Sequence, residues 1–228
     1  EMDKYVTTKV KEQINRMVEK QVNIPFTLKN IYLMVDAIYQ THEARMKQTL
    51  VEAFEKICSF SDENSTAGEK WKINSNYKIN KKFIIPWICE ADSIMKYEHL
   101  HITYKRAEEF MDVMKALCFL NGSKYEDIIQ LDTYFNYHYH IAVDGKILNG
   151  YSFHSGKDRY DQLCRTKEDL VSKGSNAEII CTRTNWGEKI DWYFFKVKGF
   201  KKGTMHFEFS DEALLDLFNY EVAKAKGW

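Results

Sequence analysis

Apolar residues at helical spacing dominate the first quarter of the chain. Within residues 3–22, valine, isoleucine and methionine recur every three or four positions among lysine, glutamate and glutamine. A second such series runs from about residue 27 to residue 59, and Thr27 is a suitable N-cap for it. The pattern predicts an amphipathic helix over 3–22, followed by one long helix or two in series. We therefore expect a helical N-terminal region over residues 1–60.

The pattern then changes to short strands with one further helix. Residues 61–69 have the composition of a loop, and residues 82–85 form an apolar strand that the following proline ends. Residues 100–104 are typical of another short strand. Residues 105–120 predict a helix with one apolar face, and Asn121-Gly122 is its stop signal.

The last third of the chain alternates most clearly. Residues 178–183 and 191–198 predict strands, residues 199–203 a turn, and residues 204–209 the returning strand of a hairpin. Ser210 is placed to cap a helix that follows, because acidic residues come directly after it, at the positive end of such a helix.

The segment between these parts is harder to interpret. Residues 150–159 have the composition of a loop, and residues 161–172 are typical of a short helix. We expect an α+β fold: a helical N-terminal half packed on a small antiparallel sheet, with a C-terminal β-hairpin followed by a helix. Residues 61–228 form its α+β region, which we expect to be one compact unit with the helices.

Composition narrows the class of protein. The chain has 228 residues, of which 44% are hydrophobic and 29% charged, so it is long and apolar enough to bury a core. Its 33 basic and 33 acidic residues give a net charge of zero, so only a local basic patch could bind phosphate.

Cellular location follows from three further features. The five cysteines are odd in number and widely spaced, which is typical of reduced thiols. The sequence has no signal peptide and no apolar run that could span a bilayer, so we expect a cytoplasmic protein with no membrane partner.

Glu1 precedes Met2, which indicates an added residue or a cut within a longer chain.

The predicted hairpin carries the strongest candidate binding site. If its strands pair symmetrically about the turn, Lys198 faces Thr204 and Lys196 faces His206. The apolar face is then core and consists of Tyr193, Phe195, Val197, Met205, Phe207 and Phe209. Cations on the other face are suited to contacts with phosphate. The candidate nucleic-acid-binding residues are Lys196, Lys198, Lys201, Lys202 and His206. The alternative is a solvated face whose lysines protect an edge strand.

Motifs for catalysis or cofactor binding are weak. His99 and His101 are two residues apart, as are His138 and His140, and such a pair on one strand face could chelate a metal ion. The spacing supplies no third ligand, so we predict no metal site and treat these residues as half-exposed histidines. The patterns GxGxxG, GxxxxGK[ST] and GxSxG are missing, so we predict no cofactor and no catalytic residue.

The segment 191–219 matches the pattern of a known family. An aromatic-rich strand is followed by a turn, a second strand that begins near a histidine, and a helix that contains Asn219. The matching residues of the hairpin are Phe200, Lys201, Gly203, His206 and Phe209, whereas Lys202 and Thr204 replace two asparagines. This segment resembles the family called domain of unknown function 4942. The resemblance is weaker over residues 27–122 and absent over 124–175, which is therefore a candidate insertion.

The resemblance implies a genetic context for the protein but no particular reaction. Members of the family resemble parts of prophage and plasmid proteins, often fused to or encoded beside DNA adenine methyltransferases, and have no assigned catalytic residues. This chain lacks methyltransferase motifs, so it would be an accessory part.

Three functions stay open on the sequence. The first is a non-catalytic accessory or DNA-recognition module, with the hairpin on the phosphate backbone and Trp186 or Tyr193 stacking on a base. The second is a protein-binding or inhibitor module that acts on a methyltransferase, a host factor or a phage factor, or that forms a homo-oligomer. Its interface would be the aromatic run 134–139. The third is a metal-dependent nuclease built on the histidine pairs.

Overall fold

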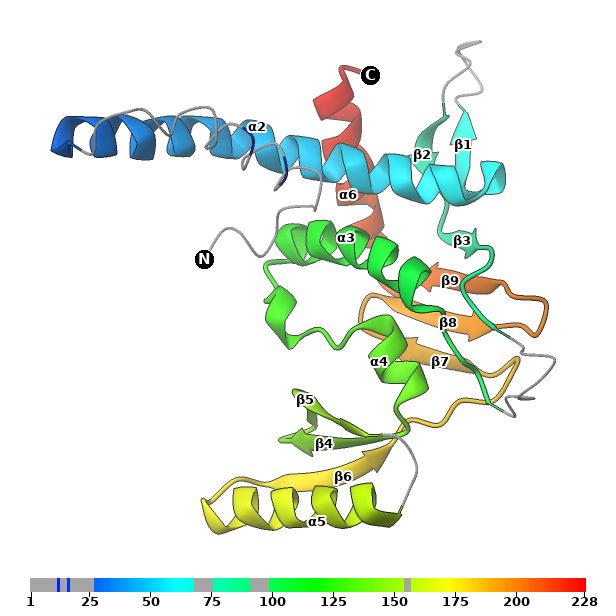
Figure 1. Ribbon diagram of the computed structural model, residues 1–228. Coiled ribbons are helices and arrows are strands. Elements are labelled where there is room, and N and C mark those ends of the chain that lie inside the picture. Colours follow the sequence, from blue (N-terminus) through cyan, green and yellow to red (C-terminus); the bar gives the residue numbers. More distant parts are fainter. Residues whose placement is uncertain (1–11, 13–15, 17–26, 68–75, 91–98, 154–156) are drawn as a thin grey trace. The chain divides into compact units, whose positions relative to one another are not determined.

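A computed structural model describes residues 12, 16, 27–67, 76–90, 99–153 and 157–228 (Figure 1). Helices and antiparallel sheets alternate along the chain, and the α+β class is confirmed. The helix expected over 3–22 lies almost wholly outside the described residues. Among the described residues, no helix is both long and apolar enough to cross a membrane.

The described residues form two compact units. The first unit contains the chain up to Asn80, together with residues 112–125 and 212–228. The second unit contains residues 81–111 and 126–211. The division into two units does not test whether residues 124–175 are an insertion, so the insertion stays a prediction.

A long helix and a two-stranded sheet make up most of the first unit. Helix α2 (Leu28–Phe60) is a single helix, and the Thr27 hydroxyl accepts a hydrogen bond from the Asn30 amide at 3.3 Å, which confirms the expected cap. The loop expected over 61–69 is in part ordered, as the 3-10 turn η2 (Asp62–Asn64) and strand β1 (Ser65–Ala67). Strand β1 pairs with the antiparallel strand β2 (Asn76–Ile79). The composition of this segment did not indicate that pairing.

Helix α6 (Glu212–Lys226) completes the first unit (Figure 1). It begins after Asp211, one residue later than the expected cap at Ser210. Its buried face includes Asn219, whose side-chain amide holds both backbone polar groups of Ile79 in β2. An amide on this helix therefore replaces the missing neighbour at the open edge of β2.

A four-stranded antiparallel sheet forms the larger part of the second unit. Its order is β3 (Lys82–Ile85), β9 (Met205–Phe209), β8 (Phe195–Gly199) and β7 (Lys189–Trp192). The apolar face packs against the first half of helix α3 (Tyr104–Asn121), where the rings of Phe110 and Phe207 lie 4.6 Å apart. The short strand expected over 100–104 is wrong: single bridges form at His99 and Ile102, and α3 already begins at Tyr104.

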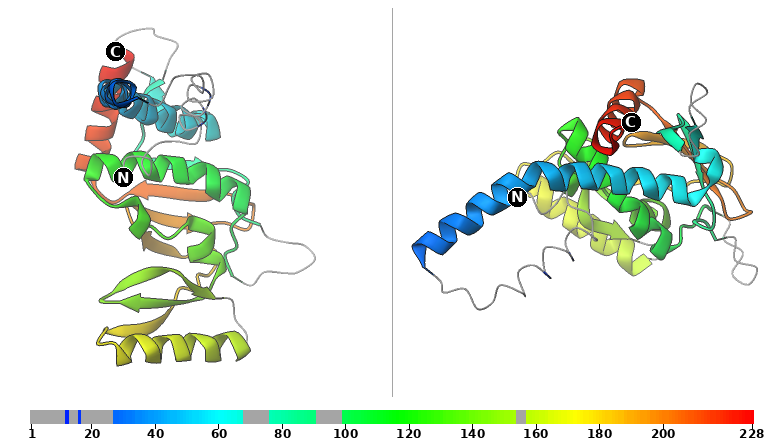
Figure 2. Two further views of the ribbon diagram at one scale, coloured as in Figure 1. Left: turned by 60° about the vertical axis from the view of Figure 1, so that its left-hand side comes forward. Right: turned by 90° about the horizontal axis from the view of Figure 1, so that it is seen from above.

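A three-stranded sheet covered by one helix forms another part of the second unit (Figure 2). Its order is β5 (Lys146–Phe153), β4 (Tyr139–Val143) and β6 (Ala177–Cys181). Helix α5 (Lys157–Ser172) packs Leu163 against Ile141. The loop expected over 150–159 is therefore wrong, because β5 and α5 occupy most of it. Short elements η3 (Tyr125–Asp127) and α4 (Leu131–Asn136) precede this sheet in the chain.

Candidate nucleic-acid interface

The register of the β8–β9 hairpin differs from the expected one by two residues. Lys198 lies opposite His206 and Lys196 opposite Glu208, because strand β8 extends to Gly199 and pairs it with Met205. Side chains alternate with a period of two, so a two-residue shift keeps every residue of β8 and β9 on its expected face. Five of the six expected core residues are buried: Phe195, Val197, Met205, Phe207 and Phe209.

Tyr193 is the exception, and its placement on the core face is wrong. The expected strand 191–198 is divided by a two-residue turn at Tyr193 and Phe194, so that Trp192 pairs with Phe195. Tyr193 has a φ of +48°. Its hydroxyl accepts a hydrogen bond from the Ile129 amide at 2.8 Å and donates one to the Asp127 carbonyl at 3.1 Å. The hydroxyl therefore fixes a loop of the second unit.

Most charges on the polar face of the sheet neutralise one another. One row across the sheet reads Lys82, Glu208, Lys196 and Asp191, with alternating sign. Lys196 Nζ lies 2.8 Å from Asp191 Oδ1, and this hydrogen bond raises the pKa of Lys196. Lys189 reaches Glu208 at 2.6 Å and lowers the pKa of that carboxyl. Phosphate would therefore meet little net charge in this row.

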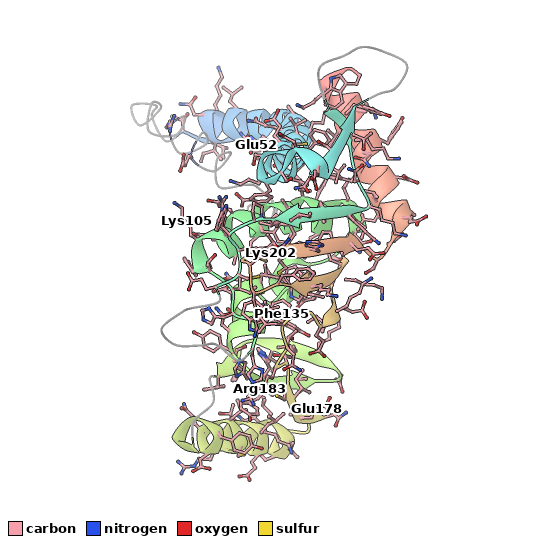
Figure 3. All side chains as sticks on the ribbon, turned by 90° about the vertical axis from the view of Figure 1, so that its right-hand side faces the viewer. Glu52, Lys105, Phe135, Glu178, Arg183 and Lys202 are labelled. Atoms are coloured by element: carbon pink, nitrogen blue, oxygen red, sulfur yellow. The ribbon has the colours of Figure 1, made fainter. Side chains whose placement is uncertain are left out.

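The tip of the hairpin is different in charge. Lys201 and Lys202, the latter labelled in Figure 3, are exposed in the loop after β8, and neither forms an ion pair within the described residues. Lys198 Nζ lies over the ring of Phe200 at 5.3 Å, and this ring is 4.7 Å from that of His206. Partial burial lowers the pKa of His206, and the charges of Lys202 and Lys198 lower it further. The tip is therefore a local concentration of positive charge.

A second loop lies directly against this tip. The Gly203 carbonyl accepts hydrogen bonds from the amides of Ile88 at 3.0 Å and Cys89 at 3.3 Å. The side chain of Trp87, in the same loop, is 72% exposed. Our sequence interpretation used Pro86 only as the end of a strand and missed this residue. The signal was present, because a proline in the second position of a turn places the next residue at its corner.

The structure does not bring the histidine pairs together as metal ligands. Both ring nitrogens of buried His140 lie 2.7 Å from hydroxyls, those of Ser152 and Thr182. Burial lowers the pKa of His140, as expected for a neutral imidazole that is held by hydroxyls. The rings of His99 and His138 do meet, with centroids 5.8 Å apart. Among the residues that the structure describes, no three histidine, cysteine or acidic side chains could hold a metal ion.

The aromatic run 134–139 is packed rather than open. Every residue of the run is buried or half-buried, and Phe135 of α4, labelled in Figure 3, is completely buried. The ring of Tyr134 stacks on that of His140 with centroids 5.9 Å apart, and Tyr139 contacts Tyr160 of α5. This run therefore serves the interior of the second unit and offers no broad aromatic surface.

Comparison with models of known protein families shows which family the chain is related to. The model of the domain of unknown function DUF4942 matches residues 1–228. The chain belongs to the DUF4942 family. The match includes residues 124–175, over which the resemblance in the sequence was not visible to us. No curated protein and no solved structure shows significant similarity to this DUF4942 chain.

Proposed function

We propose that this DUF4942 chain is a non-catalytic accessory or DNA-recognition module of a mobile element, such as a prophage or a plasmid, that is associated with DNA modification. It binds the phosphate backbone through the tip of the β8–β9 hairpin. One observation carries the proposal: Lys201 and Lys202 project from the tip without carboxylate partners in the described part of the chain, whereas Lys196 and Lys189 are ion-paired.

The size of this surface sets the expected strength. About three phosphate contacts, from Lys198, Lys201 and Lys202, give a slope of log K against log salt of about −2 for single strands and nearly −3 for duplex DNA. Affinity then falls roughly 20- to 40-fold between 50 and 200 mM salt. Such a small footprint fits an accessory part that adds local DNA contacts to another protein, for example a methyltransferase.

The test is binding of labelled DNA of about 20 nucleotides, single-stranded and duplex, across a salt series. The double variant Lys201→Ala/Lys202→Ala should weaken binding to both forms and reduce the slope by about 1.5. The matched control is the double variant Asp191→Ala/Lys196→Ala, which removes both partners of an ion pair on the same sheet and should change little, because the sum of the two charges is unchanged.

A variant with the opposite expectation sharpens the test. Asp191→Asn removes the carboxylate beside Lys196 and should strengthen binding, with a steeper salt dependence. The proposal is refuted if no association occurs at low salt, or if the association does not respond to salt.

A protein-binding function stays the second candidate because of one observation in the first unit. The beginning of α2 exposes three large apolar side chains, those of Leu28, Tyr32 and Leu33. Exposed apolar groups of this kind are typical of contacts with another protein or a second copy. Light scattering over a range of concentrations tests self-association: a constant monomer mass in both wild type and Tyr32→Ala would exclude the second copy.

A further inference from the structure

Trp87 combines exposure with an unfavourable backbone conformation. Its side chain is the most exposed of the large apolar side chains in the described residues, and its φ is +58°. Left-handed backbone is an outlier for a bulky residue, and glycine or asparagine usually occupies it. Neither burial of the ring nor backbone preference therefore explains a tryptophan here. Strain of this kind gathers where a side chain must be presented for binding.

The backbone around Trp87 is held from two sides. Gly203 of the hairpin tip accepts hydrogen bonds from Ile88 and Cys89. On the other side, the Thr103 amide donates to the Ile88 carbonyl at 2.8 Å, and the Thr103 hydroxyl lies 3.4 Å from the Trp87 carbonyl. The loop is thus fixed while the ring stays in solvent, so binding would cost little further ordering.

The ring is adjacent to the cationic tip. A Cβ atom placed on Gly203 would lie 3.8 Å from Trp87 Cε3, and Lys201 and Lys202 directly precede this glycine. A flat apolar ring beside exposed lysines is the combination with which proteins bind single-stranded nucleic acid, because bases stack on the ring and phosphates contact the cations. Duplex DNA does not offer the face of a base unless the base is flipped out.

We infer that Trp87 is a stacking surface for an unpaired base of a single-stranded nucleic acid whose phosphates contact Lys201 and Lys202. This inference rests on the proposed function and narrows its ligand from DNA in general to an unpaired strand. A hot spot for a protein partner is the competing use of an exposed tryptophan. The lysines favour the nucleic acid, since a ring that served a protein partner would need no adjacent cationic loop.

The experiment compares the affinities of variants for a 15-nucleotide oligothymidine and for a hairpin duplex of similar charge. Trp87→Ala should lower affinity for the single strand about tenfold and for the duplex less than twofold. Trp87→Phe keeps a ring and should retain most of the affinity. Tyr220→Ala is the matched control, since Tyr220 is 62% exposed on α6, away from the lysine loop in the sequence, and should change nothing.

Trp87→Gly separates binding from folding. Glycine accepts a positive φ without strain, so this variant should be at least as resistant to urea as the wild type while it loses single-strand binding. An unchanged single-strand affinity in Trp87→Ala, or equal losses for single strand and duplex, would overturn the stacking role and leave the lysine interface standing. No binding of either nucleic acid by the wild type would overturn both proposals.

Discussion

Replacement of Asn219 by leucine tests how the first unit is held together. Asn219 Oδ1 accepts a hydrogen bond from the Ile79 amide at 2.8 Å, and Asn219 Nδ2 donates one to the Ile79 carbonyl at 3.2 Å. Both residues are buried. Leucine has a similar size but neither donor nor acceptor, so Asn219→Leu leaves an amide and a carbonyl of β2 buried without partners.

The expected loss follows from these two groups. Each buried backbone group without a partner costs about 1–3 kcal/mol. Leucine is a better helix former than asparagine and returns about 0.5 kcal/mol within α6. The free energy of unfolding should therefore fall by about 2–5 kcal/mol, a large fraction of the roughly 5–15 kcal/mol that stabilises an ordinary domain.

Urea denaturation followed by far-ultraviolet circular dichroism measures this loss. The matched control is Asp216→Leu, which introduces the same residue at an exposed position of the same helix and should change the free energy by less than about 0.5 kcal/mol. Asn136 holds Ile102 of the second unit in the same way, at 2.7 and 2.8 Å, so Asn136→Leu should cost a similar amount. The reasoning fails if Asn219→Leu is as stable as its control.

Three further measurements test other parts of the chain. Gly199→Ala should lower the free energy of unfolding by about 1–3 kcal/mol, because the added Cβ would meet a side-chain carbon of buried Leu100; an unchanged urea midpoint would contradict the packing. Burial raises the pKa of Cys89 to about 12, so a thiol reagent at pH 8 should label exposed Cys181 and spare Cys89 until the protein unfolds, as mass spectrometry of tryptic peptides can show. Burial lowers the pKa of His140 below 6.5, so the unfolded chain binds the proton first; the contribution of His140 to stability should be fully present above about pH 6.5 and decrease as the pH falls toward the folded pKa, and NMR titration should give this imidazole a pKa below 6.5.

The sequence predicted correctly those helix boundaries that are marked by a capping residue or a glycine stop signal. The cap at Thr27 and the stop at Gly122, with its φ of +67°, fixed the start of α2 and the end of α3. The turn between β7 and β8 escaped prediction because Tyr193 and Phe194 are not residues that favour a tight turn. Its conformation depends on the Tyr193 hydroxyl, which bonds to backbone more than sixty residues away in the chain.

The candidate binding site also has features that the sequence predicted and features that depend on distant parts of the chain. Alternation along the strands correctly separated the core face from the polar face, because that property depends only on the period of two. Which cations stay available depends on the register and on neighbouring strands, and β7 supplies the carboxylate that neutralises Lys196. Trp87 is far from the hairpin in the sequence, and only the hydrogen bonds to Gly203 place it at the tip.

A net charge of zero does not oppose a phosphate-binding role once the charges are placed on the sheet. The row that contains Lys196 includes two carboxylates, whereas the neighbouring row reads Ile84, His206, Lys198 and Lys189 and includes none. Exposed charges are screened beyond about 10 Å at 0.1 M salt, so a bound phosphate responds to the charges beside it and not to the sum over the chain. The salt dependence of binding should therefore count the few lysines of the tip, and an acidic surface elsewhere would leave it unchanged.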